Sequence, residues 1–138
     1  MDNFYDTANR MYKSSQILHN NNEYHNACYL AGYVVECYTK IIVGLFSTNI
    51  PRSYKHNLSK LDNALQHILS GNSSLSPYIL NGSLDFMTIL SNWNPVTLRY
   101  IENTNSLHNQ YVSTNFQNEI QFAMQKLAQL QIDGHTLI

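Results

Sequence analysis

The sequence predicts an all-α fold: an up-down bundle of four or five helices that forms a single domain over residues 1–138. Apolar residues recur at helical spacing in four long segments, and no segment alternates polar and apolar residues as a half-buried strand does. Short polar connections between the long segments favour antiparallel neighbours. The length suits one domain with its own core, and no linker or internal repeat divides it.

The first two predicted helices cover residues 3–19 and 23–46. The asparagines at 20–22 end the first helix, because asparagine tolerates the left-handed conformation of a C-cap. The second helix is long and largely apolar, so we expect it at the centre of the bundle. Gly32 in its middle costs about 1 kcal/mol relative to alanine. This cost predicts that another helix approaches closely there.

The remaining helices are predicted from stripes of apolar residues at helical spacing and from residues that cap helix ends. Residues 57–70 carry an apolar stripe, with Asn57 as the N-cap and Gly71 as the C-cap. A weaker helix spans residues 83–92. The last helix covers residues 114–131, where apolar residues repeat with the 4-3-4-3 spacing of a bundle seam.

Charge and composition limit the classes of partner. Charged residues make up 12% of the chain and the formal net charge is −1. The protein as a whole therefore has no field that attracts nucleic acid or an anionic membrane. Any anion site must be local.

The sequence gives only weak indications of a membrane-spanning helix, a leader peptide or a disulfide. The longest apolar segment, residues 27–46, is interrupted by Gly32, Glu36 and Lys40, so we expect no bilayer-spanning helix. Residues 1–3 lack the basic region of a signal peptide. Cys28 and Cys37 would fall on opposite faces of one helix about 13 Å apart along its axis, too far for a disulfide. The expectation is a cytoplasmic protein with reduced thiols and no membrane partner.

Four blocks of the chain carry a family likeness. Residues 24–40 contain small residues, an aliphatic run and then Glu36 four positions before Lys40, and residues 12–18 precede them. The other two blocks are Lys55-His56-Asn57-Leu58 and Trp93 with Leu98-Arg99-Tyr100. Together and in this order they resemble segments of the HEPN family, in which the third block reads Gly-His, then Asp or Ser, then Leu.

The resemblance implies a helical bundle that is usually a homodimer. Some members are ribonucleases that act as toxins or defence effectors. Others are non-catalytic partners of small nucleotidyltransferases, or modules that bind nucleotides or RNA. The ribonuclease branch carries an Arg and then a His near the last helix, with four to six residues between them. The last predicted helix here contains neither residue type.

This departure favours a non-catalytic module in a toxin–antitoxin or defence system that binds a nucleotide, single-stranded RNA or a nucleotidyltransferase-type partner. The alternative is a metal-independent ribonuclease with an atypical site. Its catalytic candidates are His56, Arg52, Arg99 and Glu36. A purely structural dimer is a third possibility. We expect the first two helices to supply the dimer interface, because they hold most of the apolar surface.

Two interpretations compete for each candidate residue. Glu36 and Lys40 form either a helix-surface ion pair or a group in which Glu36 faces His56 and orients its imidazole. The basic residues around His56 form either a phosphate site at a helix N-terminus or a solvated loop.

Trp93, Arg99 and Tyr100 are likewise open to two interpretations. They form either a stacking and phosphate-binding patch for RNA or a core tryptophan beside an arginine that caps a helix. We expect Glu36, His56 and Arg99 to converge. We expect neither a metal site nor a cofactor, because no pattern of ligands is present. The full set of predicted binding residues is Glu36, Lys40, His56, Asn57, Trp93, Arg99 and Tyr100.

Overall fold

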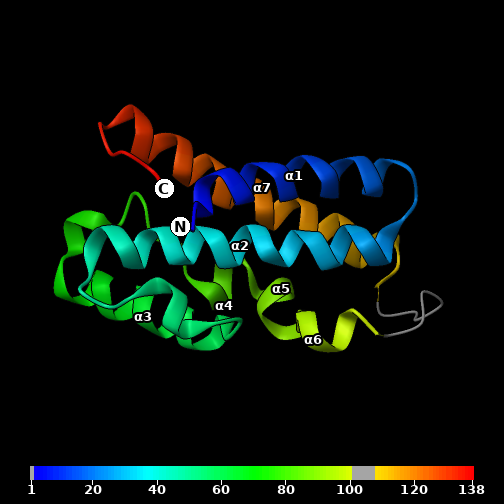
Figure 1. Cartoon of the computed structure of the whole chain (residues 1–138), viewed down its shortest axis with the longest axis horizontal. Helices are drawn as coiled ribbons and strands as arrows, with labels where there is room; N and C mark the ends of the chain where they lie inside the picture. Colours follow the sequence, from blue (N-terminus) through cyan, green and yellow to red (C-terminus); the bar gives the residue numbers. More distant parts are fainter. Residues whose placement is uncertain (1, 101–107) are drawn as a thin grey trace.

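The computed structural model describes residues 2–100 and 108–138. Within these residues all regular structure is helical, which confirms the all-α class (Figure 1). The long helices are α1 (Phe4–Asn20), α2 (Tyr24–Phe46), α3 (Leu58–Gly71) and α7 (Gln110–Ile132). The short ones are η1 (Pro51–Tyr54), η2 (Ser73–Leu75), α4 (Gly82–Asp85), α5 (Met87–Asn92) and α6 (Pro95–Leu98).

The long helices lie where the sequence predicts them, and the differences arise at caps. Asn57 is the N-cap of α3, as expected, and its side-chain oxygen accepts the Lys60 N–H at 3.0 Å. The last helix begins at Gln110, four residues earlier than predicted, because Asn109 caps it by accepting the Val112 N–H at 3.0 Å. The weak predicted helix is divided at Phe86 into α4 and α5.

The up-down order is wrong between α2 and α3. After α2 the chain doubles back, and Pro51 of η1 packs beside Gly44 of α2. His56 then reaches Glu36 in the middle of α2. The C-terminal ends of α2 and α3 line one shared hollow that includes Phe46 and Ile68. The two helices therefore run parallel, because the connection of residues 47–57 is long enough to return along α2.

The other long helices keep the antiparallel arrangement with α1. Near one end of the bundle the Tyr5 hydroxyl donates to the Gln131 side-chain oxygen at 2.9 Å. At the other end His19 Nδ1 lies 2.7 Å from the Ser113 hydroxyl. Helices α1 and α7 therefore run in opposite directions, and α2 lies between these two and α3 (Figure 1).

Helix α2 is the central helix, as predicted. Most of its residues from Ala27 to Val43 are buried. The fully buried Tyr38 also ties α2 to the segment after α3, since its hydroxyl donates to the Tyr78 carbonyl at 2.5 Å and accepts the Leu80 N–H at 2.9 Å. With α2 covered in this way, it has little surface left for the dimer interface that the sequence analysis assigned to the first two helices.

The apolar length of α2 also bears on membranes. Tyr24–Phe46 is long and apolar enough to cross a bilayer by length and composition, although the sequence analysis expected its apolar segment to be too interrupted. In the structure 67% of its most apolar window is buried inside the protein, as in the core helix of a soluble protein.

Gly32 is closely approached, but by a side chain and not by a helix. A Cβ atom built on Gly32 would lie 2.0 Å from atoms of the Trp93 indole. Trp93 is 7% exposed, and its Nε1–H donates to the Tyr29 carbonyl of α2 at 2.9 Å. Gly32 therefore makes room for an indole that is fixed by a hydrogen bond one turn earlier.

Both cysteines are free and buried, which confirms the prediction of unpaired thiols. Burial is the main cause that raises the pKa of Cys28 and of Cys37 to about 12. Neither thiol is therefore poised as a nucleophile at neutral pH.

Candidate functional site

A buried carboxylate on α2 links two basic side chains. The Glu36 side chain is 5% exposed. Its Oε1 lies 2.8 Å from His56 Nδ1, and its Oε2 lies 3.5 Å from Lys40 Nζ. The predicted contact between Glu36 and His56 is thus present. The alternative of a surface ion pair is wrong, because the Lys40 side chain is only 8% exposed.

A strained turn places His56 on this carboxylate. The turn covers residues 54–57, and the Asn57 N–H donates to the Tyr54 carbonyl at 3.0 Å. Lys55 has a φ of +52°, in the region that favours glycine. Asn57 then starts α3 directly after the turn. The imidazole is therefore held between a fixed turn and a helix cap.

We expect Lys55→Gly to stabilise the protein by about 1 kcal/mol. A non-glycine residue in this conformation stores about 1–3 kcal/mol of strain, and the greater freedom of glycine in the unfolded chain offsets part of the gain. The measurement is the midpoint and slope of urea unfolding. Lys55→Ala is the control, since it removes the same charge but keeps the Cβ atom. Equal stability of the two variants would show that the turn is unstrained.

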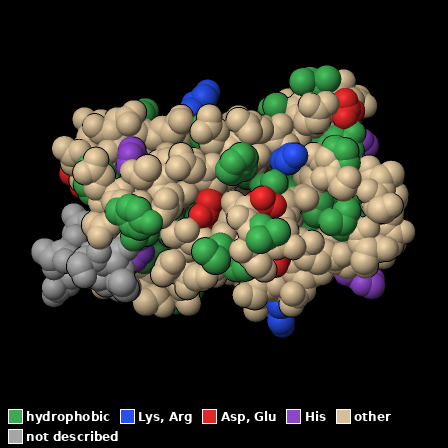
Figure 2. Space-filling model, turned by 180° about the vertical axis from the view of Figure 1, so that it is seen from behind, with side chains coloured by type: hydrophobic (Ala, Val, Ile, Leu, Met, Phe, Trp, Pro, Cys, Tyr) green, Lys and Arg blue, Asp and Glu red, His purple; other side chains and the backbone are tan. Residues whose placement is uncertain are grey.

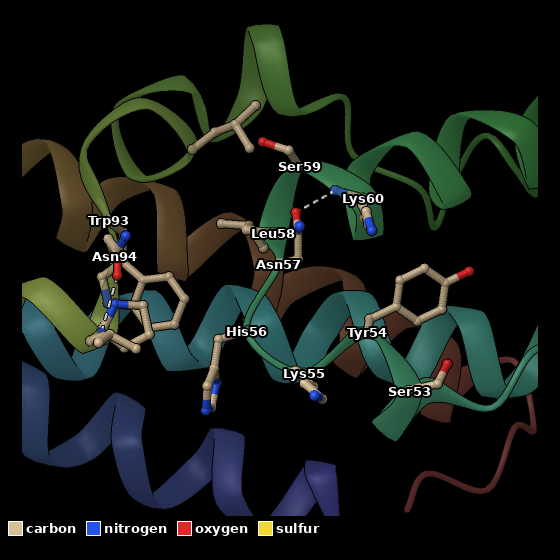
Figure 3. A pocket seen from close by; sticks show the side chains of 13 residues that line it. Ser53, Tyr54, Lys55, His56, Asn57, Leu58, Ser59, Lys60, Trp93 and Asn94 are labelled. Carbon is tan, nitrogen blue, oxygen red and sulfur yellow. Dashed lines mark hydrogen bonds between the residues drawn. The ribbon is translucent and has the colours of Figure 1, made fainter.

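A cleft of about 850 Å³ opens beside this turn. Figure 3 shows Trp93 and Asn94 on one side, Tyr54 on the other, and His56 with Lys55 between them. The cleft is lined by Ser53, Tyr54, Lys55, His56, Asn57, Leu58, Ser59, Lys60, Leu90, Trp93, Asn94, Pro95 and Val96. The lining holds three basic residues, Lys55, His56 and Lys60, and it holds no carboxylate.

Two tyrosines of α2 lie next to His56 and Trp93, although neither lines the cleft. The Tyr33 ring packs edge-on against His56 and against Trp93, with ring centres 5.8 Å and 5.0 Å apart. Its hydroxyl lies 3.3 Å from that of Tyr29. Burial is the main cause that raises the pKa of Tyr33 to about 12, whereas the hydrogen bond with Tyr33 lowers the pKa of Tyr29. Neither tyrosine was among the predicted site residues, although their i, i+4 spacing puts them on one helix face.

Arg99 joins the site only through these tyrosines. Its Nε donates to the Tyr29 hydroxyl at 3.3 Å. In the described parts of the chain Arg99 makes no ion pair with Glu36 and no hydrogen bond with His56. The structure therefore brings Glu36 and His56 together, and Arg99 is connected to them by way of Tyr29 and Tyr33. Tyr100, beside Arg99, is 79% exposed.

The remaining candidates occupy other positions. Arg52 is exposed and pairs with Asp2 at 3.0 Å, and it does not line the cleft. Trp93 is mainly a core residue, as its second interpretation predicted, with one edge on the cleft. Asn57 uses its side-chain oxygen as a helix cap. Over residues 2–100 and 108–138, no group of three or more His, Cys, Asp or Glu residues is placed to hold a metal ion.

Comparison of the chain with protein-family models, with curated proteins and with solved structures gave no match. The function is therefore argued from the geometry of the cleft and from the buried Glu36 group.

Proposed function

We propose that the chain is a HEPN-type module that binds a nucleotide or single-stranded RNA through phosphate at the cleft beside α3, without cleaving it. The observation that supports this proposal is the charge of the cleft. Its lining contains Lys55, His56 and Lys60 and no acidic residue, in a protein with nine acidic residues and a net charge of −1. A local excess of positive charge is what an anion site requires in a protein of this overall charge.

The start of α3 adds hydrogen-bond donors to this charge. Asn57 caps the Lys60 N–H, and the Leu58 and Ser59 N–H groups make no hydrogen bond to the described parts of the chain. Free N–H groups and the helix dipole both favour a phosphate at this end. A phosphate here would lie among two lysines and the edge of the His56 ring.

Glu36 fixes which ring nitrogen faces the ligand. Because a carboxylate only accepts, His56 Nδ1 must donate to Glu36, and Nε2 is the nitrogen left for the cleft. The His56 ring therefore presents its edge to a ligand in a fixed orientation.

The Glu36–His56 hydrogen bond also favours a second candidate function, that of a ribonuclease. A carboxylate that orients an imidazole is a common arrangement for a general base. Cleavage also needs a group that protonates the leaving oxygen or stabilises its charge. Neither Arg52 nor Arg99 contacts His56 within the described residues, so binding without cleavage is the preferred proposal.

Binding of ADP and of a short oligouridylate, measured by titration calorimetry, tests the two candidates. We expect Lys60→Ala to weaken both by about 1 kcal/mol, or about fivefold. Lys13→Ala is the control, because Lys13 is exposed on α1 and does not line the cleft. Equal affinities for the two variants would contradict the phosphate site. Cleavage of the oligouridylate by the wild type that is lost in His56→Ala would favour the ribonuclease.

The proposed assembly is a homodimer, with a nucleotidyltransferase-type protein as a further partner. It is supported by large apolar side chains that stay exposed on α1 and α7, among them Ile17 at 62% and Tyr111 at 75%. On the face in Figure 2, hydrophobic side chains lie in several separate groups among other side chains and backbone. Light scattering should give twice the chain mass at micromolar concentration, and a monomer mass would reject the dimer.

A further inference from the structure

A second pocket lies on the other side of the buried Glu36 group. It has a volume of about 280 Å³ and opens where the start of α1, the C-terminal half of α2, η1 and residues 136–138 meet. Most of its lining is apolar. The lining residues are Asp2, Phe4, Lys40, Ile41, Gly44, Leu45, Pro51, Thr136 and Ile138.

Lys40 is the cation of this pocket, and its ammonium group is poorly satisfied. The Lys40 side chain is 8% exposed. Its closest partner, Glu36 Oε2, is 3.5 Å from Nζ, which is long for a hydrogen bond. The Phe4 ring lies 5.5 Å from the same nitrogen, and the described residues give Lys40 no side-chain hydrogen bond. An ammonium group has three donors, so donors remain for a ligand.

The charge around Lys40 points to an anionic ligand. Glu36 provides one negative charge, and both Lys40 and His56 contact it. Lys40 therefore shares its one close counter-charge with a second basic side chain. An anion beside Lys40 would supply a further counter-charge and accept the unused donors.

The walls of the pocket restrict this anion to a small monoanion with an apolar body. The volume is at the lower end of the range for ligand pockets. Asp2 at the rim disfavours a dianion, although its pairing with Arg52 at 3.0 Å partly neutralises it. Phe4, Ile41 and Leu45 offer apolar contact and no further cation.

We propose that this pocket is a second binding site, which takes a small aliphatic carboxylate whose head pairs with Lys40. The site is separate from the phosphate cleft and does not depend on it. Lys40 and His56 both contact Glu36, so a carboxylate that pairs with Lys40 should strengthen the interaction between Glu36 and His56. A ligand in the pocket should therefore change the environment of the His56 ring at the edge of the cleft.

Octanoate is the probe, with binding followed by amide and histidine signals in NMR spectra of the whole chain. We expect saturable shifts at Ile41, Gly44 and Leu45, together with a shift of the His56 ring signals. Octanol should bind at least tenfold more weakly, because it keeps the apolar body without the charge. If octanol bound as well as octanoate, Lys40 would not be pairing with the carboxylate. If octanoate showed no saturable binding, the pocket would not be a binding site.

Two variants locate the site. Lys40→Met should weaken octanoate at least tenfold. Because this variant leaves Glu36 with one partner fewer and could unfold, Gly44→Val is the second variant. A valine at Gly44 projects toward Pro51, whose Cγ would lie 3.3 Å from the new Cβ, and fills the pocket.

Gly71→Val is the matched control, since nothing lies within 4 Å of a Cβ there. It should bind octanoate as the wild type does. Unchanged octanoate affinity in a folded Gly44→Val protein would place the binding elsewhere and overturn the proposal, whatever the cleft binds.

Discussion

Gly32→Ala should destabilise the fold by about 3 kcal/mol, although alanine is the better helix former. The new Cβ would lie 2.0 Å from the Trp93 indole, a distance at which one of the two groups must move. The indole is buried and donates to the Tyr29 carbonyl, so its movement loses packing and a hydrogen bond together. The helix-propensity gain of about 1 kcal/mol is too small to offset this loss. Urea unfolding followed by far-UV circular dichroism measures the effect.

Gly44→Ala is the control in the same helix. There the new Cβ would meet only the Pro51 ring, at 3.3 Å, on an exposed part of α2. We expect its stability to stay within about 1 kcal/mol of the wild type. A Trp93→Leu change in the Gly32→Ala background should recover part of the loss, which a double-mutant cycle would detect. A Gly32→Ala protein as stable as Gly44→Ala would mean that the indole has room to shift.

Glu36→Gln should destabilise the protein by about 3–5 kcal/mol, because it leaves the buried Lys40 ammonium without a counter-charge. Glutamine keeps the size of the side chain, so the effect is electrostatic. The same loss should shrink when Lys40→Met is added, since a buried ion pair removed as a whole costs far less than one that is broken. Chemical unfolding of the two single variants and the double variant measures this coupling.

The exposed pair Arg10–Asp6 supplies the matched comparison. It has the same i, i+4 spacing and a shorter distance, 3.1 Å, but its side chains are 62% and 64% exposed. Asp6→Asn should therefore cost no more than about 0.5 kcal/mol. If Glu36→Gln proved as mild as Asp6→Asn, water must reach Lys40 more freely than its burial indicates.

Local patterns predicted the helices well, because each depends on residues close in sequence. The long apolar run identified α2 as central, and Asn57 was recognised as a cap from its position alone. The contact between Glu36 and His56 was predicted from the family resemblance, not from spacing. It is present because the turn at Lys55 directs the imidazole to α2.

The features that sequence reasoning missed depend on the path of the chain in space. The return of residues 47–57 along α2 made α3 parallel to it, and no periodicity encodes that direction. Arg99 was expected at Glu36 but contacts Tyr29, because α6 ends near the first turns of α2. A surface ion pair was one of two interpretations for Lys40, and packing of Phe4 over its ammonium group helps to bury it.

The fit between Gly32 and Trp93 also constrains how this protein can evolve. A relative with a side chain at position 32 is expected to lack the indole at position 93, because the two groups occupy the same space. The order of the two changes matters. A smaller residue at 93 leaves a cavity that a later side chain at 32 can fill, whereas the reverse order passes through a clash between the two groups. We therefore expect the residue at position 93 to become smaller before a side chain appears at position 32. The two positions should vary together among relatives.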